Sequence, residues 1–288
     1  MGGGNWTTCS YVNHSTEKRG FATMNAFLNA SSQDLYKSYS LDSALNPKGV
    51  MRECCDSEEH PNTIPVILAL DVTGSMGSAA EAVAKQLNDI MSQLYSKVTD
   101  VEFMTMAIGD LSYDDAPIQA SQFESDIRIA EQLEKVYFER GGGGNHWESY
   151  TAAWYFGLHN TKLDCWKRGK KGIIITMGDE PMNPYLPRGP LEEVLGITLQ
   201  GDVDTKELYK EVTDKFEVYH LGINDSRNSF RRWKDEIEAT WKSLLGQNYI
   251  ETTCDDLYKT IADIIINYNT IGTTVETSIE VGENGISW

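Results

Sequence analysis

The sequence alternates short apolar runs with stretches whose apolar residues recur every three or four positions. The first run, residues 65–70, consists of Pro-Val-Ile-Leu-Ala-Leu, and a continuous apolar run of this length is typical of a strand buried on both faces. A helical pattern follows, carried by Val83, Leu87, Ile90, Leu94 and Val98. These residues are three or four positions apart and would share one face of a helix. The regular part of the chain therefore begins near residue 63.

The same alternation continues to residue 268. Further strands are expected at residues 101–108, 118–122, 172–177, 216–223 and 249–252. Helices are expected at residues 123–136, 148–159, 204–215, 229–245 and 255–268. Strands that alternate with helices predict an α/β fold, in which a mostly parallel sheet is covered on both faces. The short strand at 118–122 is expected to pair back antiparallel.

Two flanking regions differ from this central domain, residues 63–269. Residues 1–62 are rich in Ser, Asn and Thr and only weakly periodic, with short helices expected at 22–28 and 34–39. They predict a polar N-terminal arm that either wraps the main body or engages a partner. Residues 270–288 form a C-terminal tail of alternating Thr and Val character, which indicates either an added edge strand or disorder.

The net charge of the chain argues against some classes of binding partner. The 288 residues include 25 Lys and Arg and 43 Asp and Glu, for a formal net charge of −18. Such a chain lacks the basic surface that nucleic acids and anionic membranes require. The charge suits a protein that binds cations or basic partners, although an acidic surface kept for solubility is the simpler alternative.

The sequence also predicts a soluble cytoplasmic protein. It contains neither the roughly 18 consecutive apolar residues of a membrane span nor an N-terminal signal pattern. An odd number of cysteines, five, suits reduced thiols better than a disulfide framework. Cys54 and Cys55 with His60 offer zinc ligands, but no CxxC pair accompanies them, so ordinary thiols are the preferred interpretation.

A group of oxygen-bearing side chains follows the first strand. Asp71, Thr73 and Ser75 are spaced by two in a turn-rich stretch. In a doubly wound sheet, ligands bind beyond the carboxyl ends of the strands. One carboxylate and two hydroxyls form a hard oxygen cluster of the kind that Mg²⁺ prefers. A capped helix N-terminus beside a turn Asp is the structural alternative.

Residues 67–76, Ile-Leu-Ala-Leu-Asp-Val-Thr-Gly-Ser-Met, resemble the metal-ion-dependent adhesion site of the von Willebrand factor A family, D-x-[ST]-x-S after a buried strand. The order of strands and helices from about 63 to 268 is similar to that family too. The resemblance implies a doubly wound, six-stranded sheet with one antiparallel edge strand. It also implies Mg²⁺, with Mn²⁺ or Ca²⁺ as substitutes, and a protein partner whose carboxylate completes the coordination of the ion.

The resemblance implies two further ligands, and this sequence departs from the family at both. The position of the family's Thr falls on Glu148, with Ser149 as the fallback, and a helix-terminal Glu without a ligand role is the alternative. The position of the family's Asp falls on Met177, which cannot ligate Mg²⁺. Asp179 is then the expected outer-shell ligand. Asp110 follows another strand, and a turn role is preferred for it.

The glycines at 141–144 would give the loop before Glu148 backbone freedom. His146, Trp147 and Tyr150 flank that loop, either as an exposed aromatic rim for a partner or as packing against the domain. No Gly-Lys-[Ser/Thr] follows the glycines, so a phosphate-binding P-loop is not supported.

An enzyme is the minor alternative. Ser75 lies on a strand–turn–helix, and Asp179 and His220 follow it in the chain order of an α/β-hydrolase triad. Thr73 stands where the nucleophile elbow requires its first glycine, and His220 falls within a predicted strand. The expected function is therefore a non-enzymatic, metal-dependent protein-binding module.

The resemblance also suggests the setting in which such a module acts. Intracellular members of the resembled family often serve as adaptors beside AAA-type ATPases. The alternative from another class is an assembly protein of a larger particle such as a virion, for which the polar arm and tail would pack between subunits. Neither a nucleic-acid nor a membrane partner is expected, and the sequence does not indicate the oligomeric state.

Overall fold

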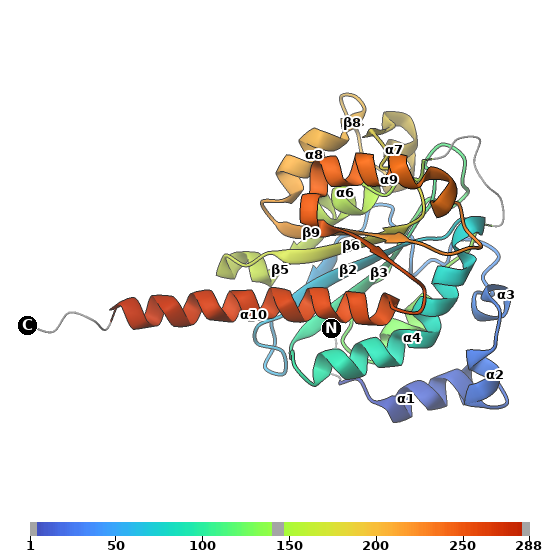
Figure 1. Ribbon diagram of the computed structural model, residues 1–288, viewed down its shortest axis with the longest axis horizontal. Helices are drawn as coiled ribbons and strands as arrows, with labels where there is room; N and C mark the ends of the chain where they lie inside the picture. The colour runs from blue at the N-terminus through green and yellow to red at the C-terminus, as the bar shows by residue number, and fades with distance from the viewer. Residues whose placement is uncertain (1–4, 140–146, 284–288) are drawn as a thin grey trace, which may run out of the picture.

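Within the described residues, six strands form one sheet at the centre of the protein (Figure 1). The computed structural model describes residues 5–139 and 147–283, with side chains as far as residue 270. Across the sheet the strands are β10 (Tyr249–Thr252), β9 (Phe216–Ile223), β6 (Gly172–Gly178), β2 (Ile64–Asp71), β3 (Val101–Ile108) and β4 (Ile118–Ala120). Neighbours are parallel except at one edge, where β4 runs antiparallel to β3. The predicted fold class is confirmed.

The strand order reverses between β2 and β6. The chain builds outward from β2 through β3 to β4, then returns to β6 on the other side of β2 and continues to β9 and β10. Leu70 near the end of β2 is in register with Met177 near the end of β6. The carboxyl ends of these two strands therefore meet at the switch point, where doubly wound sheets bind their ligands.

Helices cover both faces of the sheet (Figure 1). One face packs against α4 (Gly77–Tyr95), α5 (Arg128–Leu133) and α10 (Leu257–Glu283), and the other against α6 (Ala152–His159), α7 (Arg188–Leu195), α8 (Thr205–Val212) and α9 (Phe230–Leu245). Along β2, Leu68 and Leu70 belong to the first core, whereas Ile67 and Ala69 belong to the second. This alternation follows from the two-residue period of a strand.

Several elements differ from their expected bounds. Helix α6 begins at Ala152 rather than 148, because Glu148 instead forms a parallel bridge with Met182. Helix α10 continues to Glu283, so the edge strand considered for the tail is wrong for residues 270–283, and residues 284–288 lie outside the described residues. Extension of an existing helix needs no new nucleus and gains one backbone hydrogen bond per residue.

Two small strand pairs, and the helix between the strands of the second pair, were not expected. Strand β1 (Arg52–Cys54) pairs with β5 (Thr161–Leu163), and β7 (Tyr185–Leu186) pairs with β8 (Val203–Asp204). Helix α7, which begins at Arg188, lies between β7 and β8. Across the described residues, every helix is too short or too polar to cross a lipid bilayer.

The N-terminal segment packs against the body, chiefly along α4. It contains α1 (Thr8–Asn13), α2 (Met24–Leu28) and α3 (Ser32–Leu35). Its buried apolar side chains include Trp6, Tyr11, Phe27, Leu35, Tyr36 and Leu45. This is the first of the two arrangements expected for the arm.

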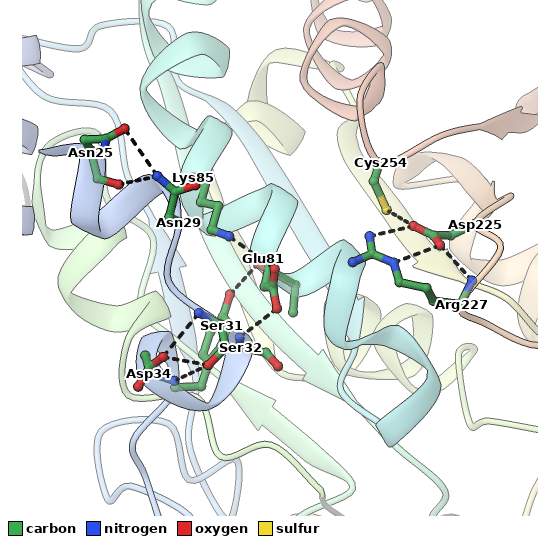
Figure 2. Close-up of polar contacts among 12 residues, drawn as sticks. Asn25, Asn29, Ser31, Ser32, Asp34, Glu81, Lys85, Asp225, Arg227 and Cys254 are labelled. Carbon is green, nitrogen blue, oxygen red and sulfur yellow. Dashed lines mark hydrogen bonds and ion pairs between the residues drawn. The ribbon is translucent and has the colours of Figure 1, made fainter.

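Polar contacts fix the same segment to α4 (Figure 2). Ser31 and Asp34 form a capping box at the start of α3. The backbone N–H of Ser32 donates to Glu81 of α4 over 2.8 Å, and Lys85 pairs with the other oxygen of Glu81 at 3.1 Å. The arm is therefore attached to the helix that directly follows the Asp71 loop.

Candidate functional site

The loop after β2 brings the three predicted oxygen donors together. Asp71 is the last residue of β2 and is fully buried. Its Oδ1 accepts hydrogen bonds from the backbone N–H of Thr73 over 2.9 Å and from the Thr73 hydroxyl over 2.6 Å. The Thr73 and Ser75 hydroxyl oxygens are 3.5 Å apart. The Thr73 hydroxyl therefore bonds the Asp71 carboxylate, and the Ser75 hydroxyl lies next to that of Thr73.

The loop after β6 adds Asp179 to this group. The Ser75 hydroxyl donates to Oδ1 of Asp179 over 3.1 Å, and the backbone N–H of Ser229 donates to Oδ2 over 2.6 Å. Ser229 immediately precedes α9. The ends of β2 and β6 and the start of α9 therefore converge on one carboxylate.

Tyr150 holds the second oxygen of Asp71. Its hydroxyl donates to Oδ2 of Asp71 over 2.7 Å, and its ring is fully buried. The ring lies against β6 at Gly178, where an added Cβ would come within 2.2 Å of the Tyr150 hydroxyl oxygen. Tyr150 therefore packs against the domain, as considered, and also donates a hydrogen bond to Asp71. A glycine at the end of a buried strand was the available signal that a side chain approaches the backbone there.

Glu148 is buried near the group without a hydrogen bond to it. Its side chain is 5% exposed, and its Oε2 is without a hydrogen-bond partner among the described residues. The same holds for Oε2 of Glu180, which follows Asp179. Ser149, the fallback ligand, instead accepts a hydrogen bond from the backbone N–H of Leu111 over 3.0 Å.

Burial raises the pKa values of Asp71, Glu148, Asp179 and Glu180, and repulsion from neighbouring carboxylates raises those of Asp71, Glu148 and Glu180 further. For Asp71 burial is the larger cause and the charge of Asp179 the next, and for Glu148 burial is followed by Asp71. Burial, with the charges of Asp71 and Asp179, raises the pKa of Glu180 to about 8. Burial also raises the pKa of Asp179. The groups that perturb these four pKa values include neither Lys nor Arg. A cation would therefore relieve this repulsion.

The carboxylate and hydroxyl oxygens of this group suit a hard cation, but the carboxylates alone are too far apart to hold one. In residues 5–139 and 147–270, three or more His, Cys, Asp or Glu side chains nowhere approach closely enough to form a metal site by themselves. A cation at the switch point would consequently rely on the hydroxyls of Thr73 and Ser75 beside the carboxylates. Hydroxyl and carboxylate oxygens are ligands that Mg²⁺ and Ca²⁺ accept. The same restriction applies to Cys54, Cys55 and His60 as a zinc site.

Two neighbouring predictions are resolved by packing. Met177 is fully buried in the core on the α4 side of the sheet. Asp110 accepts a hydrogen bond from the backbone N–H of Ser112 over 2.7 Å, which confirms its turn role.

The glycines at 141–144 and His146 lie outside the described residues. Trp147, at the start of the next described segment, is 38% exposed.

A hydrolase triad requires the His220 imidazole between Ser75 and Asp179, and His220 does not occupy that position. Ser75 donates directly to Asp179. The Nδ1 atom of His220 instead lies 2.8 Å from the Thr176 hydroxyl, and its ring stacks on Trp241 with centroids 3.6 Å apart. The imidazole is fully buried. This arrangement does not assemble a Ser–His–Asp relay.

Comparisons with known proteins give only remote similarity. No family model matches the sequence, and no curated protein matches it. The pilus adhesin SpaC from Lactobacillus rhamnosus GG is 14% identical with a TM-score of 0.47, covering 79% of this chain and 33% of its own. BatB from Bacteroides thetaiotaomicron is 16% identical with a TM-score of 0.42, covering 72% and 99%. Proximal thread matrix protein 1 from the mussel byssus is 11% identical with a TM-score of 0.47, covering 75% and 49%. The chain thus spans about a third of SpaC.

Proposed function

We propose that this chain is a non-enzymatic protein-binding module that depends on a divalent cation, most simply Mg²⁺, with Mn²⁺ or Ca²⁺ as substitutes. The cation is held by Asp71, Thr73, Ser75 and Glu148, with Asp179 in the outer shell. One observation carries the proposal: buried carboxylates meet at the switch point of the sheet, and neither Lys nor Arg contributes to their pKa shifts. Repelling charges of this kind are costly to bury unless a cation compensates them.

The hydrogen bonds of the loop support this ligand set. The Thr73 hydroxyl donates its proton to Asp71, and the Ser75 hydroxyl donates its proton to Asp179. Each hydroxyl therefore keeps its oxygen lone pairs for a cation. Tyr150 fixes Oδ2 of Asp71, and the unpartnered Oε2 of Glu148 is the remaining buried acceptor.

The bound cation supplies the positive charge that a partner's carboxylate needs in order to approach. Without it, the acidic protein, with a net charge of −18, would repel an acidic partner. The first partner class that we propose is therefore a protein that presents an Asp or Glu side chain. The setting that we propose is an adaptor for an AAA-type ATPase complex in the cytoplasm.

Titration calorimetry and thermal melts test the cation. MgCl₂, MnCl₂ and CaCl₂ are each compared with EDTA, at equal ionic strength. A cation at about 100 times its Kd should stabilise the native state by about 2.7 kcal/mol. Asp71→Ala should weaken binding at least tenfold, whereas the control Asp115→Ala, an exposed carboxylate, should not. A wild-type protein that gives neither heat nor a shift in melting temperature would overturn the proposal.

Assembly of a particle such as a virion is the second role considered. That role uses the N-terminal segment between subunits, but Tyr11, Phe27 and Tyr36 are buried against the same chain. This favours the adaptor role. Light scattering on the purified protein separates the two, because an assembly protein forms discrete large homo-oligomers and an adaptor stays small.

A further inference from the structure

Exposed aromatic side chains lie on segments beside the candidate site. The large hydrophobic side chains exposed in the described residues include Tyr113 at 58%, Trp147 at 38% and Tyr185 at 47%. Tyr113 follows β3, Trp147 precedes Glu148, and Tyr185 follows β6. Since β3 and β6 are parallel strands on either side of β2, their following loops lie at the same edge of the sheet.

Backbone contacts hold two of these loops together. The backbone N–H of Ser149 donates to the carbonyl oxygen of Gly109 over 3.1 Å, and the N–H of Leu111 donates to the Ser149 hydroxyl over 3.0 Å. The segment that carries Trp147 is therefore fixed beside the segment that carries Tyr113.

The third segment, which leads from β6 to Tyr185 at the start of β7, is fixed to the segment that carries Trp147. Glu148 forms a parallel bridge with Met182. The backbone N–H of Thr151 donates to Oδ1 of Asn183 over 3.2 Å. The Nδ2 group of Asn183 donates to the Thr151 hydroxyl over 2.6 Å and to the carbonyl oxygen of Tyr185 over 3.1 Å. Asn183 and Thr151 are both buried. The backbone that carries the three aromatic residues is thus held in place before any partner arrives.

The three described segments that carry these aromatic residues are acidic. The three segments, residues 109–117, 147–151 and 178–187, contain neither Lys nor Arg. They do contain Asp114 and Asp115, and Asp115 is exposed. An aromatic ring attracts a cationic side chain over its face, and Arg is the commonest such partner. Carboxylates next to the ring add Coulomb attraction and accept bidentate hydrogen bonds from a guanidinium.

We propose that Tyr113, Trp147 and Tyr185 form a docking surface for an arginine-rich segment of a protein partner. The inference rests on the proposed function, because it describes the rest of the partner whose carboxylate meets the cation. A second copy of this chain is a poor occupant, since its net charge is also −18 and its matching surface is also acidic.

Fluorescence anisotropy with two labelled peptides tests the surface. The peptides are (Arg-Gly)₆ and (Lys-Gly)₆, which carry equal charge, with (Glu-Gly)₆ as the negative control. The wild-type protein should bind the arginine peptide more tightly than the lysine peptide. Tyr113→Ser and Tyr185→Ser should each weaken arginine-peptide binding about two- to fivefold. The control Tyr39→Ser, at an 85% exposed tyrosine of the arm, should leave it unchanged.

The aromatic variants keep the net charge, so they separate this surface from general attraction of a polycation. Equal binding by wild type, Tyr113→Ser and Tyr185→Ser would overturn the docking surface. A dimer in sedimentation equilibrium that Tyr185→Ser dissociates would overturn it too, because the occupant would then be a second copy. Magnesium titrations of the same variants distinguish the two proposals. Normal Mg²⁺ binding with equal peptide binding overturns the docking surface alone, and absent Mg²⁺ binding in wild type overturns the cation site.

Discussion

Single residues decide how Asp71 is held. Tyr150 donates to Asp71 over 2.7 Å, and it reaches that position because Gly178 leaves room for its ring. Thr73 occupies the other oxygen of Asp71. A buried carboxylate that accepts three hydrogen bonds is oriented before a ligand binds, and this reduces the cost of forming the site.

Gly178→Ala should therefore disturb Asp71 through Tyr150. The added methyl would lie 2.2 Å from the Tyr150 hydroxyl oxygen, so the ring must move. We expect a loss of about 1–3 kcal/mol in the free energy of unfolding, as for overpacked cores, and weaker cation binding. Denaturant unfolding and calorimetry measure the two effects. Gly189→Ala is the control, because an added Cβ there meets nothing within 4 Å. Similar losses in both variants would contradict the prediction.

His220 should make stability depend on pH. Burial lowers the pKa of His220 well below its usual value, so the folded protein keeps it neutral. The unfolded chain takes up the proton near pH 6.5, so this contribution is complete above that pH and is lost as the pH falls. His220→Gln should remove that loss. Between pH 7 and 5, the stability advantage of wild type over the variant should shrink by up to about 1.4 kcal/mol per pH unit. Parallel stability curves for the two proteins would refute the assignment.

At the scale of elements, α4 links the arm to the candidate site. The helix begins at Gly77, directly after the Asp71 loop, and the N-terminal segment packs along it. The hydroxyls of Tyr11 and Tyr36 donate to backbone carbonyl oxygens of Ala84 and Ala80 in α4, over 2.6 and 2.9 Å. The arm therefore helps to fix the position of the helix on which the cation loop ends.

Tyr36→Phe tests this attachment without removing the ring. The variant loses one buried hydrogen bond and should lower the free energy of unfolding by about 0.5–1.5 kcal/mol. Tyr39→Phe, three residues along and 85% exposed, should change it by less than about 0.5 kcal/mol. Chemical denaturation of the three proteins provides the comparison. A Tyr36 variant as stable as the Tyr39 variant would show that the hydroxyl contributes nothing to docking.

At the scale of the whole molecule, the excess of 18 negative charges opposes compactness. Acidic groups are also buried at the switch point, where the charges of Asp71 and Asp179 raise the pKa values of neighbouring carboxyl groups. Repulsion between exposed charges responds to any salt, whereas the buried group is screened much less. The two contributions can therefore be separated by the choice of ion.

Raising NaCl from about 10 to about 100 mM should raise the melting temperature by a few degrees, because the screening length falls from about 30 to about 10 Å. MgCl₂ at the same ionic strength should raise it further, through the buried carboxylates. Scanning calorimetry measures both steps, and Asp71→Ala should keep the first and lose the second. A melting temperature that falls with NaCl would contradict the argument from net charge.

The sequence alone determined the six strands of the central sheet and the Asp71 loop after the first of them, because both depend on spacing within a few residues. A buried strand requires a continuous apolar run, and a helix requires apolar residues every three or four positions. The parallel order then places strand ends, and with them Asp71 and Asp179, at one edge of the sheet.

Only the tertiary structure decided which side chains complete that edge. The contact of Tyr150 with Asp71 joins residues 79 positions apart, and the burial of Glu148 depends on its bridge to Met182. The arm's place on α4 depends on Tyr11 and Tyr36 meeting a surface formed by a later helix. Such contacts depend on how distant segments pack, and the local spacing of apolar residues contains no record of that packing.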